Sequence, residues 1–188
     1  SVVSFEDSDR ATIEKNLNYD HVTPGHDIET AYLLLKASHA LGLENDSKTL
    51  KVAKRLVDHT LRTGFDEDYA GLVEVGYYFK SDGDMTILKD TKTWWAQVEG
   101  LNALLLFARF YPGEPIYKEA FLKLWNYVKE NFIDHKHGGW YSQGLDKQPE
   151  AKERNKAYQW KSCYHTARGL MNCVEMLECQ CPPFRAGY

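Results

Sequence analysis

The stretch that decides the fold is WWAQVEGLNALLLF, at residues 94–107. From Asn102 onward almost every side chain is apolar, and a helix that is apolar on all sides has to lie inside a core. Polar residues enter only near the start of the stretch. Pro112 and Gly113 follow it and prevent the helix from continuing. We therefore expect a deeply buried helix over about residues 93–110, with the rest of the chain packed around it.

Four other segments repeat apolar residues with the 3.6-residue period of an amphipathic helix. These segments cover about residues 24–41, 47–62, 115–131 and 160–177. Proline opens the first and the third of them, where its fixed φ and missing N–H suit the first helical position. Because helical pairs alternate with longer inserts, we expect an all-α fold, a layered ring of helical hairpins with the inserts gathered at one rim. No sequence repeat is strong enough to indicate a solenoid.

The inserts between the helical pairs have a different character. Residues 71–81 alternate apolar and polar side chains, which predicts a short strand or hairpin. Residues 137–141, HGGWY, indicate a tight turn beside a short strand. Residues 147–156 are highly charged and predict a solvated loop.

Composition limits the class of protein. The chain has 188 residues, a length typical of one domain, so we take residues 1–188 as a single domain. Apolar residues make up 43% and charged residues 27%, as in globular proteins rather than disordered chains. The net charge of −4 argues against a nucleic-acid partner, because neutralising phosphates takes clustered Lys and Arg. No apolar run approaches the ~18 residues of a membrane span, so no membrane partner is expected.

The chain ends and the cysteines bear on location. The first residues carry neither the basic nor the apolar segment of a signal peptide, and there is no initiator methionine, as expected of a piece cut from a longer protein. All four cysteines, Cys163, Cys173, Cys179 and Cys181, fall in the last 26 residues. That clustering favours reduced thiols in a cytoplasmic protein over a disulfide scaffold. A zinc site that uses the Cys179-x-Cys181 pair stays open as an alternative.

The first polar cluster that can carry chemistry is GHDIE, at residues 25–29. His26 and Glu29 lie three residues apart and therefore share a helix face. A carboxylate beside an imidazole fixes its tautomer and supports its protonation, which is what a general base needs. The same spacing also arises where an acidic residue simply stabilises the first turn of a helix. Both interpretations stay open on spacing alone.

The second cluster lies in WKSCYHTAR, at residues 160–168. His165 and Arg168 again lie three apart, so an imidazole that exchanges a proton has a guanidinium beside it that can hold an oxygen. A buried histidine satisfied by hydrogen bonds, with an arginine paired to a neighbouring helix, fits the spacing equally well.

The third cluster, Trp95, Glu99 and Asn102, forms one stripe at the start of the buried helix. An indole that stacks on C–H faces, with a carboxylate and an amide that read hydroxyls, suits a sugar; an aromatic core with a structural Glu is the alternative. His135 and His137 form a weaker pair without an obvious carboxylate partner, so we predict no metal site.

Four of these segments, taken in order, resemble the N-acylglucosamine 2-epimerase family, which includes the cellobiose 2-epimerases. They are GHDIE, WWAQVE, GGWY and WKxxYHxxR, and the resemblance spans about residues 23–177. It implies an (α/α)6 barrel of twelve helices in two concentric layers, with a sugar in the central funnel. Because five helices are fewer than half of twelve, the chain resembles the C-terminal part of such a barrel.

The resemblance also implies a reaction, inversion at C2 of an aldose. After the sugar ring opens, one histidine removes the C2 proton to give an enediolate, and a second histidine returns a proton to the opposite face. His26 and His165 match these two catalytic histidines. Substrate contacts would come from Glu29, which would also orient His26, from stacking on Trp95 and Trp160, and from Glu99 and Arg168. No cofactor is implied.

Three rival functions remain from the sequence. An aldose–ketose isomerase of the same fold would return the proton to C1, and an (α/α)6 glycoside hydrolase would need two carboxylates, for which Glu29 and Glu99 could serve. A non-catalytic sugar-binding or protein-binding module is the third. Ser142-Gln143-Gly144 stands where many disaccharide epimerases carry another aromatic residue, which argues against a disaccharide. A partial barrel exposes inner-layer surface, so we expect a homodimer or association with the missing N-terminal half.

Overall fold

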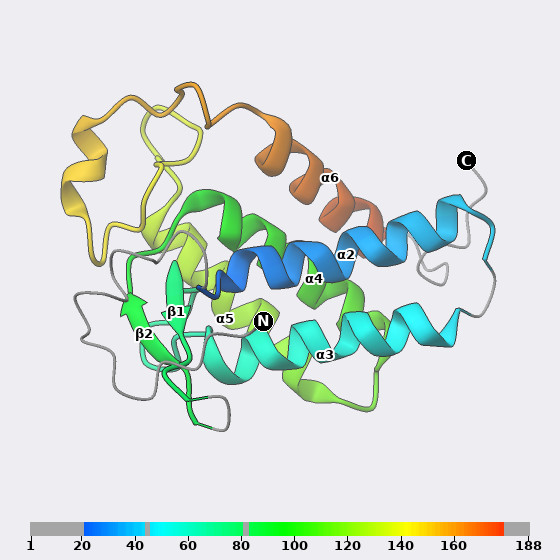
Figure 1. Cartoon of the computed structure of the whole chain (residues 1–188). Coiled ribbons are helices and arrows are strands. Elements are labelled where there is room, and N and C mark those ends of the chain that lie inside the picture. Colours follow the sequence, from blue (N-terminus) through cyan, green and yellow to red (C-terminus); the bar gives the residue numbers. More distant parts are fainter. Residues whose placement is uncertain (1–20, 44–45, 81–82, 179–188) are drawn as a thin grey trace.

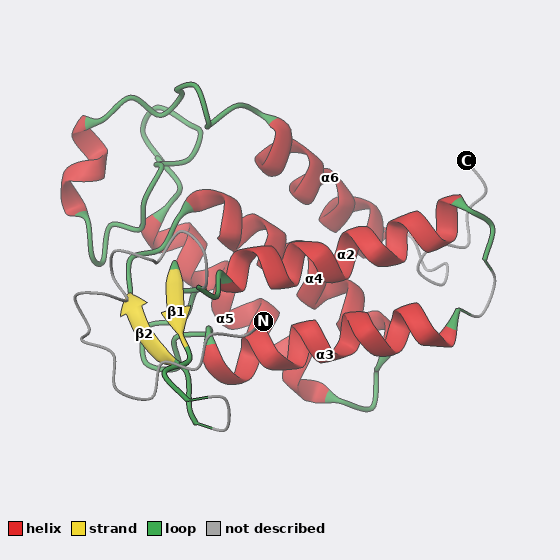
Figure 2. Ribbon diagram, in the orientation of Figure 1, coloured by secondary structure: helices red, strands yellow, loops and turns green. Residues whose placement is uncertain are grey.

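The computed structural model describes residues 21–43, 46–80 and 83–178, and Figure 1 shows their arrangement. This part of the chain is mainly helical, as predicted, with one small antiparallel hairpin (Figure 2). The helices are α2 (Pro24–Ala40), α3 (Ser47–Thr63), α4 (Trp94–Phe110), α5 (Pro115–Asn131) and α6 (Tyr164–Glu178), and the strands are β1 (Val75–Tyr77) and β2 (Thr86–Lys89). None of the described helices is long and apolar enough to cross a membrane.

The first four predicted helices are confirmed with ends that agree to within one or two residues. The fifth prediction is wrong at its start, because α6 begins at Tyr164 rather than at Trp160. A tight turn precedes the helix: the Lys161 N–H donates to the Tyr158 carbonyl, and the two residues form an isolated β-bridge. The Ser162 hydroxyl then accepts from the Tyr164 N–H, which favours a helix start at that point.

The inserts are confirmed in part. The predicted strand is β1, and it pairs with β2, which the sequence did not indicate because side chains on both faces of β2 are largely exposed. Residues 137–141 form the predicted turn, but only an isolated bridge lies beside it and no strand. The charged loop at 147–156 contains a short 3-10 helix, Pro149–Glu153.

The helices pack in two layers. Helices α2, α4 and α6 lie side by side and run in the same direction, while α3 and α5 return outside them (Figure 1). Helix α4 packs against α2, α5 and α6, so it is the centre of the described part. The three inner helices begin 70 residues apart, at Pro24, Trp94 and Tyr164. This spacing indicates a structural repeat of helical hairpins. The amino-acid sequence itself shows no repeat strong enough to reveal it.

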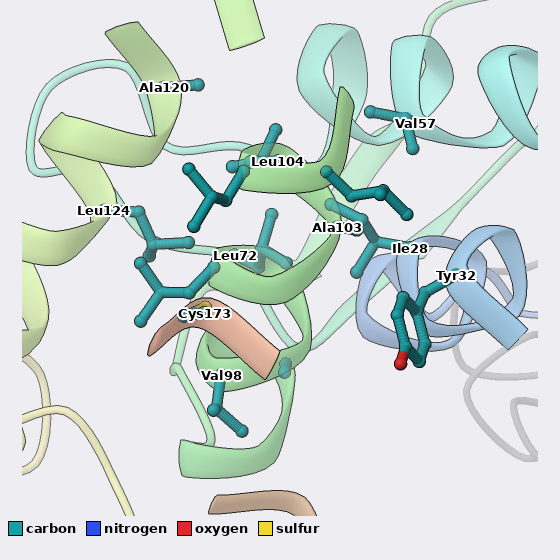
Figure 3. Packing of buried hydrophobic residues seen from close by; sticks show 14 of the residues in the cluster. Ile28, Tyr32, Val57, Leu72, Val98, Ala103, Leu104, Ala120, Leu124 and Cys173 are labelled. Atoms are coloured by element: carbon teal, nitrogen blue, oxygen red, sulfur yellow. The ribbon is translucent and has the colours of Figure 1, made fainter. Parts of the chain in front are cut away.

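The core forms around α4, as its composition predicts. Thirteen of its seventeen residues are buried, and Val98 and Leu104 belong to the same core cluster as Ile28 from α2, Val57 from α3 and Leu124 from α5 (Figure 3). Each fully buried aliphatic side chain of this size stabilises the fold by about 1.5–3 kcal/mol relative to exposure. Because the core holds α4 in place, the polar side chains of its first two turns are held in place as well.

The loops that follow α3 and α5 repeat the same geometry. In each, an aspartate Oδ1 accepts backbone N–H groups two and three residues further on: Asp66 from Asp68 and Tyr69, and Asp134 from Lys136 and His137. In each, the other carboxylate oxygen binds a lysine that follows more than twenty residues later: Asp66 binds Lys92 and Asp134 binds Lys156. Each loop also closes with an isolated bridge, Phe65 with Leu72 and Ile133 with Trp140.

Lys92 is the more buried of the two lysines. Its side chain has no exposed surface, and Nζ donates to Asp66 Oδ2 at 2.8 Å and to Asp146 Oδ2 at 2.9 Å. The Tyr127 hydroxyl donates to the other oxygen of Asp146 at 2.6 Å. Burial pushes the pKa of Asp66 upward, but the hydrogen bond from Lys92 and the backbone donors outweigh it, so the pKa is lowered. One ammonium group thus ties two loops to the start of α4.

Replacing Lys92 should destabilise the fold strongly. The change Lys92→Met leaves two shielded carboxylates without their cation, which we expect to lower the free energy of unfolding by about 3–5 kcal/mol. Lys156→Met is the matched control at the corresponding position, and it should cost clearly less because the Lys156 side chain is partly exposed. Urea denaturation measures both, and equal losses would contradict a special role for Lys92.

Candidate active site

The candidate site lies where the first two turns of the three inner helices meet. Because α2, α4 and α6 run parallel and begin at the same end, the residues near their starts converge. Six of the seven residues that the sequence assigned to catalysis or substrate binding lie in these turns: His26 and Glu29 on α2, Trp95 and Glu99 on α4, and His165 and Arg168 on α6. Glu29 and Glu99 are each the sixth residue of their helix, so they occupy corresponding positions in the repeat.

Glu99 is the hub of the polar contacts. Its side chain is fully buried, and Oε1 accepts from His165 Nδ1 at 2.6 Å and from Arg168 Nη2 at 2.5 Å. Glu29 Oε1 accepts from the same Arg168 nitrogen at 3.3 Å and lies 3.8 Å from His165 Nδ1. Two carboxylates therefore face one guanidinium and one imidazole, an arrangement that is neutral when the imidazole carries a proton.

Burial governs the electrostatics of Glu99. Desolvation raises the pKa of the Glu99 carboxyl, while the hydrogen bond from His165 and the charge of Arg168 act against the increase. The other carboxylate oxygen, Oε2, is buried and has no hydrogen-bond partner in the part of the chain that the structure describes, and the same holds for Nε and Nη1 of Arg168. Unpaired buried polar atoms are costly, so these three atoms are the unsatisfied part of the cluster.

The Trp95 indole connects the two histidines. Its centroid lies 4.8 Å from that of the His26 ring and 5.7 Å from that of the His165 ring, with interplanar angles of 34° and 42°. Both imidazoles therefore lie beside the same indole, and the two-histidine assignment stays a prediction. The His26 side of this surface is tightly packed at Gly25, where a Cβ would lie 2.7 Å from Ala96 Cβ.

Two details differ from the sequence prediction. Glu29 contacts Arg168 and His165, so it supports the second histidine rather than orienting His26. Trp160 lies in the turn before α6 with 75% of its surface exposed, because the helix on which it was expected begins four residues later. Its stacking on a sugar stays a prediction.

The sequence analysis missed residues that extend the site inward. Tyr32 lies one turn beyond Glu29, and Asn172 one turn beyond Arg168; the Asn172 amide donates to the Tyr32 hydroxyl at 2.8 Å. The Arg168 guanidinium also lies 5.5 Å from the Tyr32 ring centroid. Helical spacing from the two charged residues could have identified this pair.

The three acidic and imidazole side chains of the cluster also have the geometry of a cation site. Ligand-type atoms of Glu29, Glu99 and His165 lie within 4.8 Å of one another. Arg168 Nη2 binds both carboxylates, so a cationic side chain already lies beside them. His135 and His137 are both exposed, and His135 Nε2 bonds the Lys129 carbonyl.

A cleft of about 240 Å³ adjoins the indole. Its walls include Thr93 and Trp95 at the start of α4, and Glu74 and Lys89 from the hairpin region.

The cysteines divide by burial: Cys163 is exposed, Cys173 is buried, and both are free thiols. The zinc alternative involves Cys179 and Cys181, which lie outside the described residues.

Parallel inner helices with outer helices that return between them are consistent with a helical toroid. The family model for N-acylglucosamine 2-epimerase matches residues 6–169, so the chain belongs to the N-acylglucosamine 2-epimerase family. The resemblance inferred from the four motifs is thereby confirmed.

Individual relatives agree with that membership. The chain is 27% identical over 160 residues to cellobiose 2-epimerase of Ruminococcus albus, covering 85% of this chain and 39% of the relative. It is 32% identical over 155 residues to D-mannose isomerase of Marinomonas mediterranea, covering 82% and 36%. The chain therefore spans less than two-fifths of the length of these relatives.

Solved structures show the same partial coverage. Cellobiose 2-epimerase from Bacillus thermoamylovorans matches with a TM-score of 0.68 at 29% identity, over 83% of this chain and 38% of that one. A D-mannose isomerase structure matches with a TM-score of 0.66 at 30% identity, over 84% and 37%. The fold of the described part is thus shared with sugar epimerases and isomerases.

Close contact between α4 and α6 can be tested at Gly169. A Cβ there would lie 2.6 Å from Val98 Cγ2 and 3.2 Å from the Val98 carbonyl oxygen, so Gly169→Ala has to push α6 outward. Burial raises the pKa of the nearby Cys173 thiol to about 12, so at pH 8 only about one in ten thousand molecules carries its thiolate. We expect iodoacetamide to modify Cys163 but not Cys173 in the unmodified chain, and both in Gly169→Ala.

The matched control is Gly113→Ala, where an added Cβ meets nothing within 4 Å. Its labelling pattern should equal that of the unmodified chain in mass spectrometry. The overpacked variant should also lose about 1–3 kcal/mol of stability. Protection of Cys173 in Gly169→Ala would contradict the close approach of α6 to α4.

Proposed function

We propose that this chain is the catalytic C-terminal part of a sugar 2-epimerase, in which His26 and His165 exchange protons with C2 of an opened aldose. The observation that carries this proposal is the placement of both imidazoles against the Trp95 indole, 4.8 Å and 5.7 Å between ring centroids. Membership of the N-acylglucosamine 2-epimerase family supports the same reaction class.

The geometry suggests a role for each group. The indole of Trp95 offers a flat surface for the C–H face of the sugar chain. One histidine takes the C2 proton, made acidic by the C1 carbonyl, and the enediolate then receives a proton from the other histidine on the opposite face. Imidazoles suit both tasks, because a ring nitrogen can accept a proton in one step and donate it in another.

The polar cluster supports His165 in this scheme. Its Nδ1–H donates to Glu99, which fixes the ring and leaves Nε2 for the substrate. Arg168 lies beside both carboxylates and its side chain is 21% exposed, so its guanidinium can donate to the charged oxygens of the enediolate. Glu29 and Glu99 hold this guanidinium and imidazole in place.

The rival functions differ in support. An aldose–ketose isomerase uses the same groups and returns the proton to C1, and the likeness to D-mannose isomerase keeps it as the second candidate. A glycoside hydrolase is disfavoured, because Glu29 and Glu99 both bind Arg168 Nη2 and leave no room between them for a scissile bond.

The architecture proposed for the whole protein is an (α/α)6 barrel. Residues 1–188 would form one unit, with three inner helices and the outer helices that return between them. The resemblance to larger epimerases at TM-scores near 0.67 supports this, as does the alternation of α2 to α6. A cytoplasmic location fits the free thiols of Cys163 and Cys173.

Exposed apolar side chains support an association with further protein. On α6, Met171, Val174 and Leu177 are 63%, 51% and 66% exposed, and Leu41 after α2 is 74% exposed. We propose that the N-terminal half of the barrel, or failing that a second copy of this chain, covers them.

The isolated chain should therefore self-associate. We expect light scattering to show species larger than 21.7 kDa and an apolar dye to bind. Replacing the exposed residues in the triple variant Met171→Ser, Val174→Ser, Leu177→Ser should reduce both signals. A monodisperse monomer that binds no dye would contradict the proposal.

The reaction itself is tested by exchange in D2O. The complete product of the gene that encodes this chain, and this chain alone, are incubated with N-acetylmannosamine, mannose and cellobiose and followed by NMR. An epimerase places deuterium at C2 of both epimers, whereas ketose formation indicates the isomerase and cleavage the hydrolase.

Variants then test the two-histidine assignment. His26→Ala and His165→Ala should each reduce epimer formation by at least about a hundredfold, because one face of C2 then lacks its proton carrier. The control is His39→Ala, which changes a histidine at the far end of α2 and should keep full activity. Full activity in either of the first two variants would overturn the assignment.

A further inference from the structure

We propose that Asp27, His59 and Tyr78 form a side-chain relay that positions His26. His59 Nδ1 lies 3.1 Å from Asp27 Oδ2, and His59 Nε2 lies 2.8 Å from the Tyr78 hydroxyl. The simplest pairing has Nδ1–H donating to the carboxylate and the Tyr78 O–H donating to Nε2. The inference rests on the proposed function, since it assigns a positioning role to residues that act through a catalytic histidine.

The relay joins three elements at one point. Asp27 lies in the first turn of α2, His59 in the last turn but one of α3, and Tyr78 directly after β1. All three side chains are partly buried, with exposed fractions of 24% for His59 and 28% for Asp27. Through these two contacts, His59 connects the start of α2 to the outer helix and to the hairpin.

The start of α2 is also held from its other sides. The backbone of Val22 exchanges two hydrogen bonds of 2.9 Å with Gly76 of β1. Gly25 packs so closely against α4 that a Cβ would lie 2.7 Å from Trp95 Cη2. His26 thus stands between Gly25, which is fixed against α4, and Asp27, which is fixed against α3.

His26 needs such support more than His165 does. Glu99 holds His165 directly through Nδ1. The His26 ring is exposed and lies against the Trp95 indole. No hydrogen bond reaches this ring from the described part of the chain. Its position therefore depends on the backbone of the first turn, and a displacement of about 1 Å at a reacting group can cost a hundredfold in rate.

Two substitutions at one residue separate the links of the relay. In His59→Asn the side-chain amide takes the place of Nδ1 and keeps a donor for Asp27, whereas in His59→Gln the amide takes the place of Nε2 and keeps only the contact with Tyr78. Asp27→Asn weakens the contact between Asp27 and His59 from the Asp27 side. Thr63→Ala is the control, because Thr63 bonds the His59 carbonyl from the same turn of α3 and lies outside the relay.

The first readout is C2 deuterium exchange from each epimer separately, in the complete gene product. A protein that lacks a working His26 can still exchange the epimer whose proton faces His165. We expect His59→Gln and Asp27→Asn to slow exchange about 10- to 100-fold for the one epimer that His26→Ala also blocks, with less than about a twofold change for the other. His59→Asn and Thr63→Ala should exchange both epimers normally.

The second readout is independent of turnover. The His26 ring lies close to the Trp95 indole, so its Cε1 proton resonance should be displaced by the ring current. His59→Gln should return that resonance toward its position in an unstructured peptide, and His59→Asn should leave it in place.

The two readouts separate the possible failures. Equal slowing of both epimers in His59→Gln, or an unchanged exchange pattern, would overturn the relay as a positioning device, and so would an unmoved His26 resonance. If the unmodified protein exchanges no C2 proton while the resonance shifts as expected, the epimerase proposal fails and the structural link between His59 and His26 stands.

Discussion

A single buried carboxylate, Glu99, holds the site together. It lies on α4, the helix around which the core packs, and binds two residues of α6 at once. A buried charge is tolerated only when it is paired, so the start of α6 has to lie where His165 and Arg168 can reach Glu99. The apolar remainder of α4 fixes that helix in the core, and the position of His165 follows from the position of the core.

The structural repeat explains how a few residues from distant parts of the sequence come together in one cluster. The inner helices begin 70 residues apart and run in parallel, so corresponding positions come together at one end. Glu29 and Glu99 correspond, and both bind Arg168. Three positions further on, Tyr32, Asn102 and Asn172 also correspond, and Asn172 bonds Tyr32. The Asp66 and Asp134 loops repeat the same principle at the rim, where a lysine closes each one.

Much of the fold could be predicted from the sequence, and the rest failed for physical reasons. Helix α4 was evident because its apolar residues surround it, whereas the start of α6 was misplaced because Trp160 continues the apolar period into a turn. Strand β2 gave no signal, since its side chains are largely exposed. For the site, helical spacing identified residues that share a face, such as His165 and Arg168.

Spacing within one helix cannot reveal contacts between helices. Glu29 pairs with Arg168 and not with His26, because of the way α2 and α6 lie beside α4. That arrangement in turn depends on Gly25 and Gly169, which allow the helices to approach closely. His59 had no local pattern at all. Its partners are 32 and 19 residues away, so only the folded arrangement brings them together.

The parallel direction of α2, α4 and α6 has an electrical consequence. Each helix carries a partial positive charge of about half an elementary unit at its amino end, and three such ends point into the same small volume. Their combined field favours negative charge at the place where the Glu29 and Glu99 side chains lie. The direction in which the backbone runs thus contributes to the electrostatics of the cluster before any side chain is considered.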